Sequence, residues 1–423
     1  MNGSTGIQVG IVSHSDSGGG AARASLRLAL ALRKNDVETR MFVSRKGTDY
    51  QFIQTKIDKF SRAISFIRPT FGSIITRLLK TKNPCLHSGN WFHNSLLTDI
   101  NNENLDIINL HWINGETLSI SDISKISKPI VMTLHDMWAF CGAEHLCYEL
   151  EDIRYKSGYL KGNFPKTSSG LDINRLVWNR KKKCWSKKFY IVCPSQWLAE
   201  CAKSSALFNG WPIYVIPNPL DLMVFKKIDK YQARDIINLP KSKKLIGFGA
   251  IGGLNQKHKG FDLLIESLKK ISDINSSEHD IEVVIFGESE PYVKPDIDFP
   301  IHYLGELKDD TTLAITYNSL DVMVVPSRVE NLPQTATESI ACGVPVVAFN
   351  TSGIPSAVSH NLTGYLAKAF DIDDMIEGIN YCLKHGDILS NHCVQYAKEY
   401  WSEEVVAQKY KQLYRETLDA TKK

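Results

Sequence analysis

Two glutamates in the C-terminal half of the chain, Glu330 and Glu338, have the side-chain type and the setting to bind a polar ligand. Glu330 follows an apolar run in a loop that leads through Asn331 and Leu332 to Pro333, where a helix is expected to begin, and Glu338 falls about a turn and a half inside that helix. A carboxylate accepts hydrogen bonds from two vicinal hydroxyls at once, and a helix N-terminus favours an anion. The pattern therefore indicates a site for a ligand that carries both hydroxyls and phosphate. Taken alone, such a pair is more often a capping carboxylate and a surface glutamate.

A lysine upstream of the glutamates, Lys259, is placed to neutralise an anion. It opens an expected helix after a strand at 244–248 and a glycine-bearing loop that starts at Gly249. An ammonium group at a strand-to-helix turn can stabilise a diphosphate leaving group in place of a metal ion. An ordinary solvated lysine is the alternative, and for a single lysine it is the better explanation.

Three consecutive glycines, Gly18, Gly19 and Gly20, follow the first expected strand and open a helix rich in alanine and leucine. Glycine permits a tight turn and a close approach of the backbone to a ligand. A turn without any ligand would explain the run equally well.

Two histidines end neighbouring strands in the N-terminal half. His135 follows the strand at 130–134, and His111 follows the strand before it. A histidine at the carboxyl end of a strand can hydrogen-bond a hydroxyl or stabilise developing charge, whereas a structural histidine is the alternative. We rank His135 first and His111 second.

The nine cysteines are an odd number, scattered between Cys85 and Cys393. Cys141, Cys147 and Cys184 flank a long segment without clear periodicity, but no cysteines repeat at a spacing typical of zinc ribbons or disulfide frameworks. We therefore expect reduced thiols and no metal site.

The length and composition indicate an ordinary two-domain protein. Single hydrophobic cores stop growing near roughly 250 to 300 residues, and this chain has 423, of which 43% are hydrophobic and 23% charged. No stretch approaches the roughly 18 uninterrupted apolar residues of a membrane-spanning helix, and the N-terminus enters a strand pattern without a basic and apolar leader. We expect a cytoplasmic protein.

Short β-branched runs alternate with helical periods in both halves of the chain, which predicts parallel sheets with crossover helices and hence the α/β class. The expected strands and helices of the N-terminal half are 7–12, 21–34, 37–43, 106–110 and 129–134. Those of the C-terminal half are 244–248, 261–271, 281–286, 301–304, 309–318, 321–325, 334–342 and 344–348.

The two domains are expected to meet near Pro217. Pro217 and Pro219 follow a short apolar strand and stiffen an extended connection, so the hinge is placed here, between domains at 1–216 and 217–400. The final residues, 401–418, have apolar side chains at helical spacing and are expected to form one amphipathic helix.

The two glutamates, with seven residues between them, and the run that follows them closely resemble a known family, the retaining glycosyltransferases of family 4. The runs that carry the resemblance, in their expected order, are Pro194-Ser195-Gln196-Trp197-Leu198, Ile216-Pro217-Asn218-Pro219-Leu220-Asp221, Lys259-Gly260-Phe261-Asp262-Leu263-Leu264, Ala341-Cys342-Gly343-Val344-Pro345-Val346-Val347 and Thr363-Gly364-Tyr365-Leu366. The resemblance implies the GT-B fold, in which two Rossmann-like domains face a central cleft and the C-terminal helix at 401–423 crosses back onto the first domain.

The resemblance also implies roles for single residues. Glu330 would contact the donor sugar and Glu338 the ribose of the nucleotide, and Gly18 to Gly20 would line the cleft beneath the donor diphosphate. Relatives usually have an arginine shortly after the first glycine of the loop at 249–253, where this chain has Ala250-Ile251-Gly252-Gly253. We expect Lys257 to take the place of that arginine beside Lys259.

The run Thr133-Leu134-His135-Asp136-Met137-Trp138 resembles the His-Asp-Met-Trp signature of one subset of the family, which is found among transferases of bacterial surface polysaccharides. This resemblance favours a functional role for His135. Retaining transferases of this fold are thought to use front-face attack, in which the leaving phosphate takes the proton of the acceptor. His135 therefore need not be a general base, and no cofactor or metal ion is required.

Two basic segments bear on the acceptor. Residues 56–82 contain seven lysines and arginines against one acid, around a helical stripe of apolar residues, and residues 180–188 contain six cations and no acid. Such a helix can lie on an anionic membrane surface, and a helix packed on the N-terminal sheet with a basic outer face is an equal alternative. No module typical of nucleic-acid binding is recognisable.

These observations together predict a transferase that moves a hexose from a UDP- or GDP-linked donor to a glycan. The expected acceptor is a polyprenyl-diphosphate-linked saccharide, which the protein would reach as a peripheral protein at the inner face of the membrane. A sugar-nucleotide epimerase or another non-transferase enzyme on the same fold, or a non-catalytic partner protein, are the alternatives.

Overall fold

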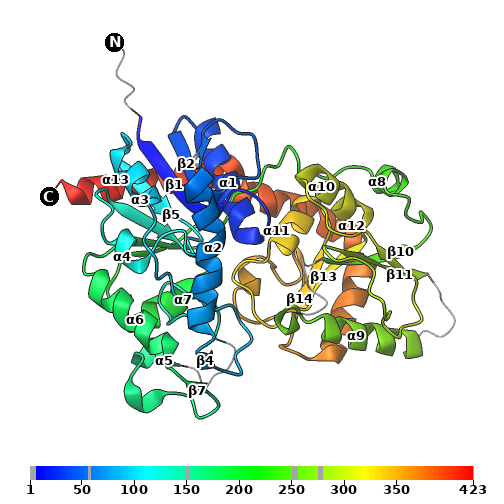
Figure 1. Ribbon diagram of the computed structural model, residues 1–423. Coiled ribbons are helices and arrows are strands. Elements are labelled where there is room, and N and C mark those ends of the chain that lie inside the picture. The colour runs from blue at the N-terminus through cyan, green and yellow to red at the C-terminus, as the bar shows by residue number, and fades with distance from the viewer. Residues whose placement is uncertain (1–5, 56–58, 148–152, 250–255, 275–279, 423) are drawn as a thin grey trace. The chain divides into compact units, whose positions relative to one another are not determined.

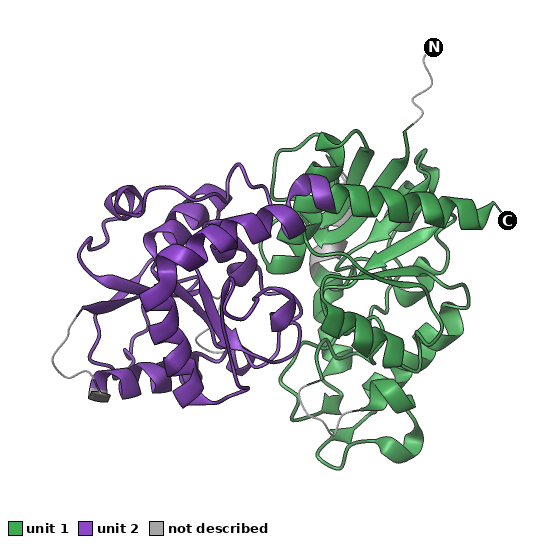
Figure 2. Cartoon of the chain, turned by 180° about the vertical axis from the view of Figure 1, so that it is seen from behind, with its two compact units in different colours: residues 1–218, 406–423 green, residues 219–405 purple. Residues whose placement is uncertain are grey.

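The computed structural model describes residues 6–422 apart from 56–58, 148–152, 250–255 and 275–279. The chain divides into two compact units (Figure 2), unit 1 with residues 1–218 and 406–423 and unit 2 with residues 219–405. Each unit contains a parallel sheet with helices on both faces, so the expected pair of Rossmann-like α/β domains is confirmed. The hinge near Pro217 concerns motion and stays a prediction.

The sheet of unit 1 has the strand order β3-β2-β1-β5-β6-β8-β9, and all neighbouring strands are parallel. Its strands are β1 (Gln8–Ser15), β2 (Glu38–Arg45), β3 (Ile53–Gln54), β5 (Ile107–Leu110), β6 (Ile130–Thr133), β8 (Tyr190–Cys193) and β9 (Ile213–Val215). The strand order reverses between β1 and β5. In open α/β sheets, ligands bind at the carboxyl ends of the strands beside such a reversal.

Helices cover both faces of this sheet (Figure 1). The helices of this unit are α1 (Gly20–Lys34), α2 (Lys59–Thr76), α3 (Leu96–Asn102), α4 (Ile120–Ile123), α5 (Arg154–Ser157), α6 (Ile173–Cys184), α7 (Gln196–Ser204) and α13 (Glu403–Thr421). Successive strand residues belong to different cores, as Ile11 and Val12 of β1 do. Burial on both faces explains why these strands are apolar runs rather than alternating patterns.

The C-terminal helix α13 packs onto the sheet of unit 1 through two buried tyrosines. The Nδ2 of Asn109 donates to the hydroxyl of Tyr414 at 2.8 Å, and the hydroxyls of Thr133 and Tyr410 lie 3.1 Å apart. Thr133 also donates to Asn109 Oδ1 at 3.0 Å. Since these polar atoms are buried, the network satisfies them and fixes the position of α13.

The sheet of unit 2 has the order β12-β11-β10-β13-β14-β15 and is also parallel throughout. Its strands are β10 (Lys244–Gly249), β11 (Ile281–Phe286), β12 (Ile301–Tyr303), β13 (Val322–Val325), β14 (Val346–Phe349) and β15 (Gly364–Ala367). Its helices are α8 (Lys230–Ile236), the short helix η3 (Lys257–Lys259), α9 (Phe261–Ile274), α10 (Asp310–Ser319), α11 (Gln334–Ala341), η4 (Ile354–Ser356) and α12 (Ile372–Trp401). The order reverses between β10 and β13, so the segments after these two strands meet at one edge of the sheet.

Several elements were not among the sequence-based expectations, and two of the differences lie in the C-terminal part. The long helix α12 is missing from them, although Asp371 caps it and its buried residues recur at helical spacing. The expected helix at 401–418 is α13, which begins at Glu403 because Ser402 adopts an extended conformation between the two helices. None of the helices in the described ranges is long and apolar enough to span a membrane.

Candidate functional site

The first part of the candidate site is the loop after β13, which carries Glu330. The amide of Glu330 donates to Ser352 Oγ at 2.9 Å, and its carbonyl accepts from the amide of Gly353 at 2.8 Å. A Cβ atom at position 353 would lie only 1.6 Å from the carbonyl oxygen of Asn331, so only glycine allows this approach. The backbone at Glu330 is therefore held in place by the segment after β14.

Lys259 reaches this loop from the other side of the strand reversal. Its Nζ donates to Glu330 Oε1 at 2.6 Å, and Ser327 Oγ donates to the same oxygen at 3.2 Å. Gly260, with φ of +70°, ends η3, and a Cβ atom there would lie 1.9 Å from the carbonyl oxygen of Pro326. Two residues 71 positions apart in sequence thus form an ion pair because β10 and β13 are neighbours in the sheet.

A second ion pair fixes the short helix η3. Arg328 donates to both carboxylate oxygens of Asp262, at 2.8 and 2.7 Å, and to the carbonyl of Lys257 at 2.7 Å. Its amide also donates to the carbonyl of His258 at 2.7 Å. The hydrogen bond and charge of Arg328 lower the pKa of Asp262, and burial followed by the charge of Lys259 lowers the pKa of His258. Lys257, the expected substitute for the missing arginine, has an exposed side chain.

Glu338 lies on α11 and is buried, with 2% of its surface exposed. The hydroxyl of Tyr317, on α10, donates to Glu338 Oε2 at 2.8 Å. Sequence analysis did not identify Tyr317, because nothing in its local pattern distinguishes it from a core aromatic. The buried carboxylate is thus oriented by one hydroxyl and is no ordinary surface glutamate.

The other expected donor-binding residues of unit 2 have mixed surroundings. The side chain of Leu332 packs in the core, so only its backbone is available to a ligand, whereas Asn331 is partly exposed. A Cβ atom at Gly249 would lie 2.2 Å from the ring of Phe286, so packing alone requires glycine there. The run at 250–253, where the family's arginine is missing, lies outside the described residues.

The glycine run of unit 1 forms an exposed turn between β1 and α1. Gly18 has φ of +90°, and the positions where Cβ atoms of Gly18 and Gly19 would lie are open space. The start of this turn is fixed by the buried Asp16, which accepts from the amide of Gly47 at 2.7 Å and from the hydroxyl of Thr48 at 2.6 Å. The space above these glycines is compatible with a ligand close to the backbone.

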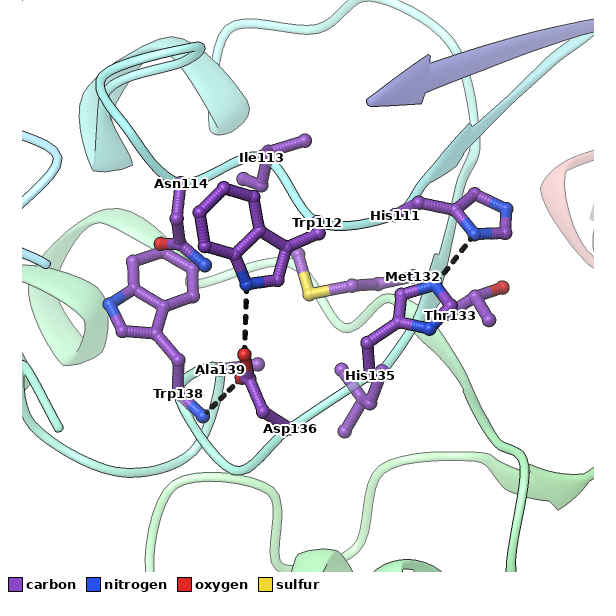
Figure 3. Close-up of a pocket in the computed structure, with 11 residues that line it drawn as sticks. His111, Trp112, Ile113, Asn114, Met132, Thr133, His135, Asp136, Trp138 and Ala139 are labelled. Atoms are coloured by element: carbon purple, nitrogen blue, oxygen red, sulfur yellow. Dashed lines mark hydrogen bonds between the residues drawn. The ribbon is translucent and has the colours of Figure 1, made fainter. Parts of the chain in front are cut away.

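Two histidines meet in a pocket at the carboxyl ends of β5 and β6, as Figure 3 shows. His111 Nδ1 lies 2.9 Å from His135 Nε2, and the two rings are stacked with their centroids 5.1 Å apart. Burial lowers the pKa of His135 from 6.5 to about 4, and burial followed by the charge of His135 lowers the pKa of His111 well below 6.5. Both rings are therefore neutral near pH 7.

The wall of this pocket is built from Asp136 and its partners. Asp136 accepts from Trp112 Nε1 at 3.0 Å, from the amide of Trp138 at 2.9 Å and from His145 Nδ1 at 2.6 Å. Burial opposes the charge of Asp136, but the charge and hydrogen bonds of these partners still lower its pKa. Asp136 thus holds the loop that follows His135 rather than a ligand.

Two polar atoms in the same pocket remain open to a ligand. The buried His111 Nε2 and Asn114 Oδ1 have no hydrogen-bond partner within the described part of the chain. Sequence analysis missed Asn114 and also His14, which ends β1 and lies 2.8 Å from the hydroxyl of Thr117. The rule that selected His135, a histidine at the carboxyl end of a strand, would have found His14.

The two basic segments differ in the exposure of their side chains. On α2, the side chains of Ile67, Phe71 and Ile74 are between 51% and 55% exposed, and Leu78, just after the helix, is 51% exposed, so this part of the apolar stripe is not packed on the sheet. In the segment at 180–188, by contrast, Lys181 is fully buried. Lys181 donates to backbone carbonyls of unit 1, at 3.1 Å to that of Cys141 and 2.7 Å to that of Gly142, whereas Lys182, Lys183, Lys187 and Lys188 are exposed.

Cysteine and carboxylate side chains come together in one place within the described ranges. Cys141, Glu144 and Cys147 have ligand atoms within 4.8 Å of one another, and Cys184 lies apart from them on α6.

Comparisons with known proteins identify related families for both units. The model of Glycosyltransferase Family 4 matches residues 18–223, and the model of Glycosyl transferases group 1 matches residues 229–400. A curated relative, an uncharacterized glycosyltransferase of Haemophilus influenzae, is 26% identical over 180 residues, which are 38% of this chain and 49% of the relative. The matched part thus spans about half the length of that relative.

Solved glycosyltransferase structures have the same fold over nearly the whole chain. Anabaena Alr3699/HepE, in complex with UDP-glucose, superposes with a TM-score of 0.62 at 14% identity, over 98% of this chain and 100% of that one. WaaG, a glycosyltransferase involved in lipopolysaccharide biosynthesis, superposes with a TM-score of 0.59 at 13% identity, over 96% of this chain and 99% of that one. At these identities the likeness is one of fold.

Proposed function

Because the chain belongs to the glycosyltransferases, we propose that it moves a hexose from a UDP- or GDP-linked donor to a glycan acceptor with retention of the anomeric configuration. The observation that carries the proposal is the ion pair of Lys259 and Glu330 at the strand reversal of unit 2, with the buried Glu338 on the next helix. A nucleoside diphosphate sugar offers one partner to each of these groups: a diphosphate, a hexose and a ribose diol.

The Lys259–Glu330 pair can be rearranged by an anionic ligand at low cost. Both side chains are partly exposed, at 26% and 16%, so water can solvate each group as the pair separates. When the donor binds, Lys259 is proposed to turn to the diphosphate and Glu330 to accept from hydroxyls of the sugar. Lys259 then stabilises the negative charge that develops on the leaving phosphate as the C1–O bond breaks.

Retention requires that the new bond to C1 forms on the face that the leaving group vacates. In the proposed front-face step, the acceptor hydroxyl attacks C1 as the bond to the phosphate breaks, and its proton passes to the leaving phosphate oxygen. His135 is assigned a hydrogen bond to a sugar hydroxyl, since an imidazole whose pKa is lowered to about 4 is a weak base. The step needs no metal ion.

The proposal is tested with the purified full chain and a panel of UDP- and GDP-linked sugars, by release of nucleoside diphosphate and by NMR of the product anomer. We expect turnover of one donor and a loss of at least about 100-fold in Glu330→Gln, as for removal of one group that stabilises a transition state. Glu399→Gln, an exposed glutamate of α12, is the matched control and should turn over normally. A folded wild type that is inert to every donor would instead favour a non-catalytic partner protein.

For the acceptor, we propose a polyprenyl-diphosphate-linked saccharide, reached at an anionic membrane surface through α2. Support comes from the exposed apolar side chains of this helix, flanked by the exposed Arg77, Lys80 and Lys82, and from the similarity in fold to WaaG. Flotation with vesicles of neutral lipid alone or with anionic lipid tests this. Phe71→Ser should reduce flotation several-fold and Ile388→Ser, an exposed residue of α12, should not. Absence of flotation with either lipid would argue for a soluble acceptor.

A further inference from the structure

The cluster formed by Cys141, Glu144 and Cys147 plays no part in the proposed transfer reaction. It lies in the long segment between β6 and α6, which has little regular structure and yet is buried at Cys141 and Glu144. A buried irregular segment must be held by something other than strand and helix hydrogen bonds. The cluster is therefore a candidate for the group that holds it.

The distance between the two sulfur atoms matches a shared tetrahedral metal ion. Cys141 Sγ and Cys147 Sγ lie 3.7 Å apart. Two thiolates bound to one zinc ion at about 2.3 Å with a tetrahedral angle are about 3.8 Å apart. A disulfide would require about 2.05 Å.

The third group favours a metal ion over a redox pair. A carboxylate oxygen of Glu144 lies within 4.8 Å of both sulfur atoms. A negative carboxylate next to two thiols opposes formation of the thiolate that disulfide exchange requires, whereas it is an ordinary zinc ligand. The hydroxyl of Tyr159 donates to Glu144 Oε1, and carboxylates that bind metals are usually held by such a hydrogen bond.

The surrounding charge also fits a bound dication. The ammonium of Lys181 is fully buried near Cys141 and Glu144, and its hydrogen bonds go to the carbonyls of Trp138, Cys141 and Gly142. Two thiolates and one carboxylate balance the charge of a dication to within one unit, and Lys181 provides buried hydrogen bonds to the backbone of the same segment.

We propose that Cys141, Glu144 and Cys147 are ligands of a structural zinc ion. Its ligands come from the same segment as Asp136, which lines the histidine pocket, and His145, whose Nδ1 lies 2.6 Å from Asp136 Oδ2. The antiparallel bridge between His87 and Glu144 joins this segment to the one that carries Cys85, two residues before His87. The ion would fix the segment that positions the pocket, without contact to the reacting groups.

The proposal is tested on the full chain, expressed with zinc in the medium and purified under reducing conditions without chelator. Metal analysis should find one zinc ion per chain in the wild type and less than about a tenth of that in Cys141→Ser and in Cys147→Ser, as expected for loss of a ligand. Cys184→Ser, another half-buried cysteine of the same unit, is the matched control and should keep its zinc. Circular dichroism shows whether each variant has folded.

Cobalt gives a second measurement that does not depend on the stability of the variants. Wild-type protein stripped with chelator and reloaded with Co²⁺ should show a thiolate-to-cobalt charge-transfer band in the near ultraviolet, and Cys184→Ser should show the same band. A folded wild type without bound metal, with all nine thiols titratable after denaturation, overturns the proposal. Two fewer thiols than nine, together with a Cys141–Cys147 linked peptide, would overturn it in favour of a disulfide.

Discussion

The carboxylate site of unit 2 and the histidine pocket of unit 1 occupy equivalent places in their sheets but differ in chemistry. Both lie at the carboxyl ends of strands, at or next to the reversal of strand order. In unit 2 the meeting groups are Lys259 and Glu330, which are charged and partly exposed. In unit 1 they are His111 and His135, which burial keeps neutral near pH 7.

The difference teaches how each site can respond to a ligand. Lys259 and Glu330 are partly exposed, and in the proposed function they exchange each other for the phosphate and hydroxyls of the donor. The desolvated imidazoles cannot gain charge cheaply and serve as fixed hydrogen-bonding groups. Unit 2 has a partly exposed ion pair on a backbone with close contacts at Gly260 and Gly353. Unit 1 has buried, neutral imidazoles.

The largest expected effect is that of replacing Lys259 in the charged site of unit 2. Lys259→Met should lower kcat/KM by about 100- to 1,000-fold with the donor that the panel identifies, because the charge on the leaving phosphate loses its counter-ion. Lys269→Met, an exposed lysine of α9 paired with Asp296, is the control and should keep full activity. If Lys259→Met kept an activity within about threefold of the wild type, Lys259 would have no role in the reaction. The contrast between a charged site in unit 2 and a neutral pocket in unit 1 would then not hold.

Glu338 tests whether a buried carboxylate can also be a ligand group. Glu338→Gln should raise KM for the donor about 10- to 100-fold with a smaller change in kcat, since a hydrogen bond to a charged group contributes about 1.5 to 3 kcal/mol. Steady-state kinetics give the two constants. The thermal unfolding of the variant should be measured beside the kinetics, because Glu338 is buried against Tyr317. A fall in kcat with KM unchanged would mean that Glu338 acts in the transition state and does not hold the ribose.

The buried, neutral His135 of unit 1 predicts that the stability of the folded chain depends on pH. In the unfolded chain His135 titrates near 6.5, and in the folded chain its pKa is lowered to about 4. Between these values the unfolded chain binds a proton that the folded chain does not, so the stability is fully present above pH 6.5 and is lost as the pH falls towards 4.

His135→Asn should therefore make the loss of stability on acidification shallower, by on the order of 1 to 2 kcal/mol at pH 4.5. Denaturant unfolding at a series of pH values measures the slope. Burial also lowers the pKa of His14 to about 4. His14 therefore adds to the loss of stability on acidification in the wild type and in His135→Asn alike. His392→Asn, an exposed histidine of α12, is the control, and a slope of His135→Asn equal to that of the wild type would show that His135 is not desolvated.

The smallest effect concerns the pair that supports Lys259. Arg328→Lys keeps the charge but loses the two-pronged contact with Asp262, so the turn at η3 should loosen and KM for the donor should rise about two- to fivefold. Asp262→Asn should have the same effect, and the double variant should be no worse than either single one. An additive loss in the double variant would show that the two residues act separately.

Much of the local structure could be predicted from the sequence. Apolar runs buried on both faces gave the strands of two parallel sheets, and the turns at Gly18 and Pro333 marked the starts of α1 and α11. The helix α12 could have been found from its cap at Asp371 and its buried stripe. These features follow from hydrogen-bonding rules and periodicities that act over a few residues.

The contacts between distant residues could not be predicted in the same way. Glu330 and Lys259 were each selected, but not as an ion pair, and Tyr317 was not selected as the partner of Glu338. Lys181 belonged to a basic run in the sequence and proved to be buried. Cys141 and Cys147, without a recognisable ligand spacing, meet at Glu144.

The sequence by itself determined which segments become strands, helices and turns, and therefore the class of fold and the loops on which ligand-binding groups lie. Only the tertiary structure decided which of those groups meet, because the order of strands in a parallel sheet brings together loops that are far apart along the chain. That order makes Lys259 the partner of Glu330 and His111 the partner of His135. It is set by the packing of crossover helices on both faces of each sheet, which no local pattern encodes.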